Sequence, residues 1–235
     1  MAGRAGAGVR GDLPMAMSLG EKAHYEIRRM IVRLDLPPGA IVREDELQTA
    51  LGIGRTPIRE ALQRLAREQF VTVIPRRGML VASLEVADLP VLYETRAMLE
   101  PYAARLACAR GTAKHWTQMA ATIERSHRKG VSDSELLDID RACHETFWDA
   151  AGNRLLTDTL DVLYAQCDRL WHLYLSDVAD MAHAVDEHAA ILDALRAGDG
   201  DRSAALVEAH VRAFDAQIRD AVSRHLATPL RSAAS

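Results

Sequence analysis

From about residue 86 to residue 226, the sequence is a succession of long amphipathic segments with no strand pattern between them. In each segment apolar residues recur every three or four positions, which is the spacing of one face of an α-helix. Gly, Asn or Asp residues separate the segments, as at Gly152-Asn153 and from Gly198 to Gly200. Six helices of this length bury their apolar faces by packing into a bundle. The predicted helices cover residues 86–110, 113–129, 133–151, 154–175, 178–197 and 201–226.

The segment before the bundle has a different pattern, in which shorter helices come first. Helical spacing covers residues 21–34, and a second helix over residues 44–51 is expected to end at Gly52. A third helix is expected to start with Thr56 as its N-cap and Pro57 in its first turn. These signals predict three helices near the N-terminus.

A β-hairpin is expected after the third helix. The stretch from Phe70 to Ile74 is rich in β-branched residues, Pro75 to Gly78 form a turn, and residues 79–82 provide a return strand. Three helices followed by a hairpin is the order of a winged helix-turn-helix. We therefore predict a mostly α protein, with a winged helix-turn-helix over residues 18–82 and an all-α bundle of about six helices over residues 86–228.

The charge of the chain is unevenly distributed. Residues 21–82 contain 11 Lys and Arg against 8 Asp and Glu, a net charge of +3, whereas residues 83–235 contain 16 against 24, a net charge of −8. This asymmetry indicates a basic module that binds a polyanion and an acidic module with another task. Residues 1–17, rich in Gly, Ala and Arg, are expected to be a disordered tail, and residues 229–235 a second tail.

The third predicted helix carries cations and hydrogen-bond donors opposite its apolar face. Arg55 and Arg59 are four residues apart and Thr56 lies between them. The first turns of a recognition helix enter the major groove, where arginine binds guanine or phosphate. Arg77 and Gly78 lie at the tip of the predicted wing, where glycine permits close approach to the minor groove. Any one of these arginines alone is more typical of a solvated surface, but the arrangement as a whole predicts DNA binding.

The same segment strongly resembles the GntR family of bacterial transcription regulators. The matching residues are Pro38-Gly39, Glu46-Leu47, the run LGIGRTPIREALQRL from Leu51 to Leu65, and Pro75-Arg76-Arg77-Gly78. The resemblance implies that Arg55, Thr56 and Arg59 contact operator DNA and that Arg77 and Gly78 lie in the wing. Some members carry an Arg where Asp45 stands here, so their base preference does not transfer to this chain.

Four polar residues of the second domain lie on helix faces that are otherwise apolar. Asp140 and His144 are four residues apart and share one face of the 133–151 helix. His188 and His210 lie on the apolar faces of two later helices. A lone His on such a face is usually a core residue with a satisfied hydrogen bond, but four buried polar groups together need a partner. A divalent metal would satisfy them, and three imidazoles with one carboxylate suit zinc, nickel, manganese or iron.

The order of these residues also resembles the FCD domain, the helical effector-binding domain of the FadR-like branch of the GntR family. Gly152-Asn153, Glu187-His188 and the run from Tyr93 to Glu100 match this domain as well, and the six-helix count is that of its shorter, VanR-type form. In that family, the Asp and three His at the matching positions hold a metal beside the effector cavity. The resemblance therefore implies an effector site close to the metal.

Two arginines are candidates for effector binding. The resemblance implies that Arg96 faces the cavity and pairs with the carboxylate of a small effector such as a sugar acid, which Arg does well in bidentate geometry. The alternative for Arg96 is a surface ion pair with Glu100, four residues later. Arg169 is the second candidate, although the opposite face of its helix fits the sequence equally well.

These features predict a cytoplasmic homodimer that binds double-stranded operator DNA in response to an effector and is not an enzyme. The three cysteines have no paired spacing, as expected of reduced residues, and no apolar stretch is long enough for a membrane span. The alternative is a metal-dependent hydrolase with a DNA-binding appendage. It needs a general base beside the metal, and Glu145 and Glu187 each point about 100° away from the neighbouring ligand on their helices.

Overall fold

The structure is a computed structural model that describes residues 17–76, 78–83, 86–174 and 181–227. Contacts divide the chain into two compact units. The first unit contains the described residues up to Ile31 and Gly39–Ala82, and the second contains Val32–Pro38 and the described residues from Ser83 onward. Arg77 and the two predicted tails, apart from Met17, lie outside the described residues.

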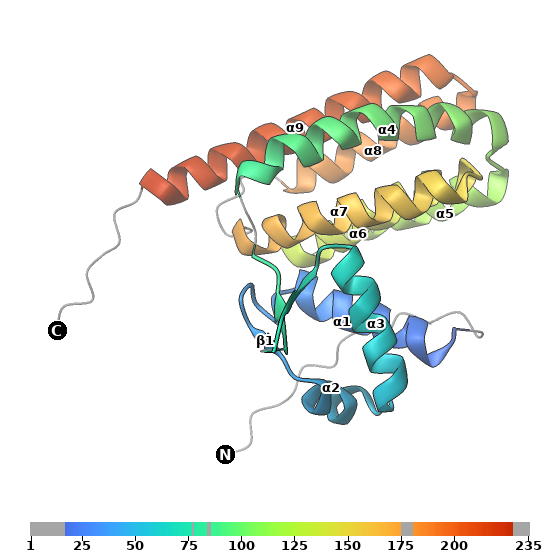
Figure 1. The fold of residues 1–235 in the computed structure, drawn as a ribbon. Coiled ribbons are helices and arrows are strands. Elements are labelled where there is room, and N and C mark those ends of the chain that lie inside the picture. Colours follow the sequence, from blue (N-terminus) through green and yellow to red (C-terminus); the bar gives the residue numbers. More distant parts are fainter. Residues whose placement is uncertain (1–16, 77, 84–85, 175–180, 228–235) are drawn as a thin grey trace. The chain divides into compact units, whose positions relative to one another are not determined.

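The described part of the first unit consists of three helices and a small antiparallel sheet (Figure 1). Its elements are α1 (Leu19–Val32), β1 (Ile41–Val42), α2 (Glu44–Leu51), α3 (Arg55–Arg67), β2 (Val71–Ile74) and β3 (Gly78–Val81). β3 is the central strand and pairs with both β1 and β2. The winged helix-turn-helix prediction is confirmed, but β1 was missed because its two residues are too few to show an alternating pattern.

The core of the first unit is formed by apolar side chains from the helices and the sheet. Its fully buried side chains are Ala23, Ile27, Ile31, Ile58, Leu62, Leu65 and Phe70. The α3 members of this set recur every three or four residues, so one side of α3 is buried and the opposite side faces outward. Burial of this stripe therefore fixes which side chains of α3 are presented on the surface.

α3 begins two residues earlier than the capping signal indicates. Gly54 is the N-cap residue, with an extended backbone and no side-chain cap hydrogen bond. The prediction that Thr56 caps this helix is therefore wrong, because Thr56 already lies in the first turn. As a consequence Arg55 is the first helical residue, at the end of the helix that a winged helix-turn-helix presents to DNA.

The second unit is a bundle of six long α-helices within the described residues, as the periodicity predicts. Its elements are η1 (Val86–Asp88), α4 (Leu89–Arg110), α5 (Ala113–Glu124), η2 (Arg125–His127), α6 (Asp133–Ala150), α7 (Arg154–Tyr174), α8 (Met181–Ala197) and α9 (Gly200–Ala227). α4 runs beside α9 along much of its length (Figure 1). None of the described helices is long and apolar enough to span a membrane.

Two local features hold the helices that carry the polar cluster. α6 begins with a capping box, in which Ser132 accepts from the backbone N–H of Glu135 and the Glu135 carboxylate accepts from Ser132. α7 is tied to α4 by a buried hydrogen bond from Trp171 Nε1 to the hydroxyl of Tyr93, 2.6 Å long. These contacts set the start of α6 and the position of α7, and both helices lie around the cluster described next.

Candidate metal centre and nucleic-acid interface

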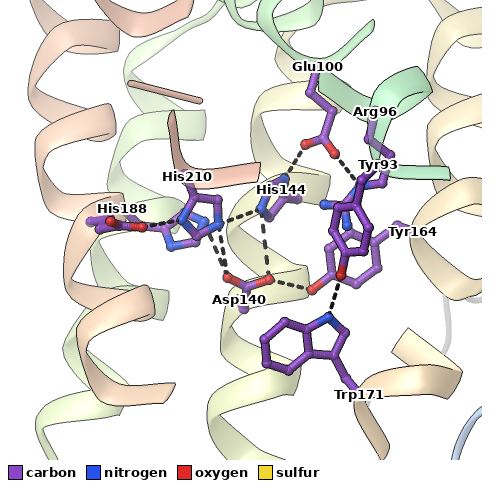
Figure 2. Close-up of polar contacts among 10 residues, drawn as sticks. Tyr93, Arg96, Glu100, Asp140, His144, Tyr164, Trp171, His188 and His210 are labelled. Atoms are coloured by element: carbon purple, nitrogen blue, oxygen red, sulfur yellow. Dashed lines mark hydrogen bonds and ion pairs between the residues drawn. The ribbon is translucent and has the colours of Figure 1, made fainter. Parts of the chain in front are cut away.

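The second unit brings four side chains that could hold a metal ion together in its interior (Figure 2). Asp140 and His144 come from α6, His188 from α8 and His210 from α9. All four are at most 2% exposed, and one potential ligand atom from each lies within 4.8 Å of the others. The sequence predicted this set of residues, and the structure brings all four into one cluster.

The three histidines direct their Nε2 atoms toward Asp140. Nε2 lies 3.8 Å from the carboxylate in His144, 3.7 Å in His188 and 3.3 Å in His210. Oδ1 of Asp140 and Nε2 of His188 make no hydrogen bond within the described residues. Because buried polar atoms without partners are costly, and because imidazole nitrogens and a carboxylate oxygen are ligands of divalent transition metals, these residues fit a metal ion.

Burial and neighbouring charges shift the pKa values of the clustered residues in different directions. Burial lowers the pKa of His188 to about 3, with a contribution from His210. Burial would also lower the pKa of His210, but contacts with Asp140 and Glu187 outweigh it and raise this pKa to about 9. Burial likewise opposes ionisation of Asp140, yet the three histidines hold its pKa well below the usual range. A metal ion at this site would therefore compete with a proton for Nε2 of His210.

A second ring of polar residues surrounds the four ligands, and sequence reasoning did not assign it to the site. Glu100 Oε2 lies 2.5 Å from Nδ1 of His144, and Glu187 Oε2 lies 2.7 Å from Nδ1 of His210. The hydroxyl of Tyr164 donates to Oδ2 of Asp140 at 2.5 Å. A signal for Glu100 was present, since it recurs at helical spacing with buried α4 residues such as Ala97 and Ala104.

Arg96 forms the predicted ion pair with Glu100, but the pair is buried and does not lie on the surface. Its Nε donates to Oε1 of Glu100 at 2.6 Å, and both side chains are almost fully buried. Its Cζ lies 4.7 Å from the ring centroid of Tyr164 and 5.5 Å from that of Tyr93, within cation–π range. Burial opposes the charge of Glu100, but Arg96 and His144 outweigh it and lower the pKa of Glu100 to about 2.

Arg169, the other candidate for effector binding, is also buried. Its Nη1 donates to the side-chain oxygen of Gln166 at 3.1 Å, and burial lowers its pKa to about 10. A groove of about 500 Å³ lies elsewhere, between α4 and α9. Its lining residues are Pro90, Tyr93, Glu94, Ala97, Met98, Glu208, Arg212, Asp215 and Arg219. Neither predicted effector-binding arginine is among them.

Asp168, on α7, is a buried carboxyl whose ionisation the fold disfavours. Burial and the nearby Asp138 and Asp140 raise its pKa to about 7, and Arg141 acts in the opposite direction. The native state therefore binds the Asp168 proton more tightly than the unfolded state does. The free energy of unfolding therefore decreases as the pH rises from about 4 to about 7.

We expect Asp168→Asn to stabilise the protein most above pH 7. The free energy of unfolding should rise by at most about 4 kcal/mol, because each pKa unit corresponds to about 1.4 kcal/mol. This increase should become steadily smaller as the pH falls toward 4. Denaturant unfolding of parent and variant at pH 5, 6, 7 and 8 measures the difference. Asp158→Asn, at an exposed position of the same helix, serves as the control. A gain that is the same at every pH would contradict the raised pKa.

The exposed side of α3 carries the predicted DNA-binding residues of that helix. Arg55, Thr56 and Arg59 are all exposed in its first two turns. Nε of Arg59 donates to Oε2 of Glu44, at the start of α2, over 2.8 Å. Gly78 is exposed at the start of β3, with a positive φ of 99° that favours glycine. The structure thus places three predicted DNA contacts on one helix end, and Glu44 was not foreseen as a partner of Arg59.

Comparison with known families decides the class of protein. Residues 19–81 match the family model described as bacterial regulatory proteins, gntR family, and residues 91–213 match the FCD domain. The chain belongs to the GntR family. This GntR-family protein is a DNA-binding transcription regulator with an FCD effector-binding domain.

Individual relatives support the same assignment. The GntR-family protein is 31% identical to the Nta operon transcriptional regulator of Aminobacter aminovorans over 194 residues, covering 82% of this chain and 91% of that protein. It is 24% identical to the transcriptional repressor RspR of Escherichia coli over 215 residues, covering 90% of this chain and 93% of that protein. Its fold resembles that of E. coli McbR/YncC, with a TM-score of 0.77 and 19% identity over 87% of this chain and 99% of the other.

Proposed function

We propose that this regulator binds operator DNA as a cytoplasmic homodimer and that a small carboxylate effector, bound near a divalent metal, sets its operator affinity. The observation that carries the proposal is the cluster of Asp140, His144, His188 and His210, buried inside the domain that accompanies a DNA-reading helix. When bound, the metal would supply a positively charged, Lewis-acidic centre that attracts carboxylate oxygens.

On the DNA side, Arg55, Thr56 and Arg59 are proposed to read the major groove from the first turns of α3. Arg77 and Gly78 are proposed to reach the minor groove from the wing. In a two-fold dimer the two copies of α3 would bind half-sites about one helical turn apart, roughly 34–36 Å. This arrangement predicts an operator with two-fold symmetric half-sites.

On the effector side, Arg96 and Arg169 are the proposed cationic partners of the ligand. Arg96 has the better support, because it contacts Glu100, and Glu100 in turn contacts His144 of the proposed metal site. An effector carboxylate that pairs with Arg96 competes with Glu100 for its guanidinium. Such a ligand changes operator affinity by the ratio of its affinities for the two conformations of the protein.

The test is fluorescence anisotropy with the DNA upstream of the protein's own gene and a scrambled duplex, at about 0.15 M salt. We expect binding to the native fragment at least roughly a thousandfold tighter than to the scrambled duplex. A panel of small carboxylates, added to the metal-loaded protein, is expected to contain one that shifts operator affinity by about 5- to 150-fold. Equal, weak binding to both duplexes would count against operator recognition there, and an unresponsive panel against carboxylate control.

A further inference from the structure

We propose that Glu100 and Glu187 are positioning residues of the metal centre, each fixing one ligand histidine in the tautomer that leaves Nε2 open to the metal. The inference rests on the proposed metal site, but it concerns residues that would not touch the ion. The sequence alone suggested that Glu100 is a surface partner of Arg96. It also suggested that Glu187 points away from the metal site.

The two contacts have the same form. Glu100 meets Nδ1 of His144 at 2.5 Å, and Glu187 meets Nδ1 of His210 at 2.7 Å. In each ring the other nitrogen, Nε2, faces the cluster, and these two Nε2 atoms lie 3.2 Å apart. Figure 2 shows the His144 ring between Glu100 and Asp140.

The chemistry of the partners determines the tautomer. A carboxylate can only accept a hydrogen bond, so the ring nitrogen that faces it must carry the proton. A neutral imidazole has one N–H, and a proton on Nδ1 therefore leaves the lone pair on Nε2. This is the nitrogen that points at Asp140 in both residues. Without the carboxylates, part of each histidine population would carry its proton on Nε2 and could bind a metal there only after losing that proton.

Glutamine substitution tests the two carboxylates differently, because both oxygens of Glu100 are known acceptors at this site. Oε1 of Glu100 accepts from Arg96 Nε at 2.6 Å while Oε2 accepts from His144, so both oxygens are needed as acceptors. Glutamine has one acceptor oxygen and one NH₂ group, and at position 100 it must present the NH₂ group either to Arg96 or to His144. At position 187, glutamine can still turn its oxygen toward His210.

This difference gives a pattern that a merely structural role would not produce. We expect Glu187→Ala to weaken Zn²⁺ binding by about 10- to 100-fold, the usual cost of losing an outer partner of a ligand histidine. Glu187→Gln should retain most of the affinity, because its oxygen still accepts from Nδ1. Glu100→Gln should lose about 10- to 100-fold despite its similar shape.

The experiment measures Zn²⁺ dissociation constants of the full-length variants by competition with a chromogenic chelator. Glu208→Ala is the matched control, since it removes the same charge from α9, two residues from His210, and its side chain pairs with Arg212. Circular dichroism checks that each variant is folded. Because Glu187 is about one third exposed, its variants keep the test valid if Glu100→Gln does not fold.

The possible outcomes separate the two proposals. If Glu187→Ala binds Zn²⁺ as tightly as Glu208→Ala does, the positioning role is overturned and the metal site stands. If Glu187→Gln loses as much affinity as Glu187→Ala, charge alone matters and the tautomer argument is wrong. If the parent protein itself does not retain Zn²⁺, both the positioning role and the metal site are overturned.

Discussion

Removing the metal is expected to lower the melting temperature of this protein by about 8–16 °C. An ion that binds only the folded state stabilises it by roughly 4 kcal/mol when its free concentration is about 1,000 times the dissociation constant. For a chain of this size, each kcal/mol shifts the melting temperature by about 2–4 °C. The measurement compares thermal unfolding of the Zn²⁺-loaded protein before and after addition of a strong chelator.

His144→Ala is expected to abolish that chelator-induced shift. His144 is fully buried and its ring lies 5.2 Å from that of Phe147, so the substitution also removes core packing and lowers the melting temperature by itself. The informative quantity is therefore the change on chelation within each protein. His127→Ala, at an exposed position, should keep the full shift. If chelation destabilises His144→Ala as strongly as the parent, His144 does not bind the metal.

The sequence was sufficient to predict the four residues of the buried cluster, because they violate the pattern around them. Asp140, His144, His188 and His210 stand where helical spacing calls for apolar side chains, and such exceptions can be recognised without coordinates. The same spacing predicted six helices, since each break between them contains Gly, Asn or Asp. Features that repeat along one helix could thus be predicted, including the face on which each ligand lies.

Features that depend on a neighbouring helix could not be predicted. Glu187 points away from His188 on its own helix, as its spacing shows, but this direction leads it to His210 of α9. Arg96 and Glu100 have the spacing of a surface pair, and only the packing of other helices over α4 shows that the pair is buried. The same holds for Glu44, which meets Arg59 across two helices.

Arg59→Ala is expected to have the largest effect on DNA binding, roughly 30-fold to 10⁴-fold in operator affinity. A bidentate contact to a base contributes about 1–3 kcal/mol, and a dimer loses two of them. The contact with Glu44 uses Nε of Arg59 and not the two Nη groups. We expect this contact to orient the guanidinium so that its Nη groups can make the proposed contact with DNA.

Anisotropy against the operator and the scrambled duplex separates base reading from general charge. Arg67→Ala removes the same charge from the exposed last turn of α3 and should weaken binding to both duplexes slightly and equally. Arg59→Ala should lose mainly the preference for the operator, with its Zn²⁺ content unchanged. An equal loss on both duplexes, with a smaller salt dependence, would instead assign Arg59 to a phosphate, because a contact to the backbone carries no sequence information.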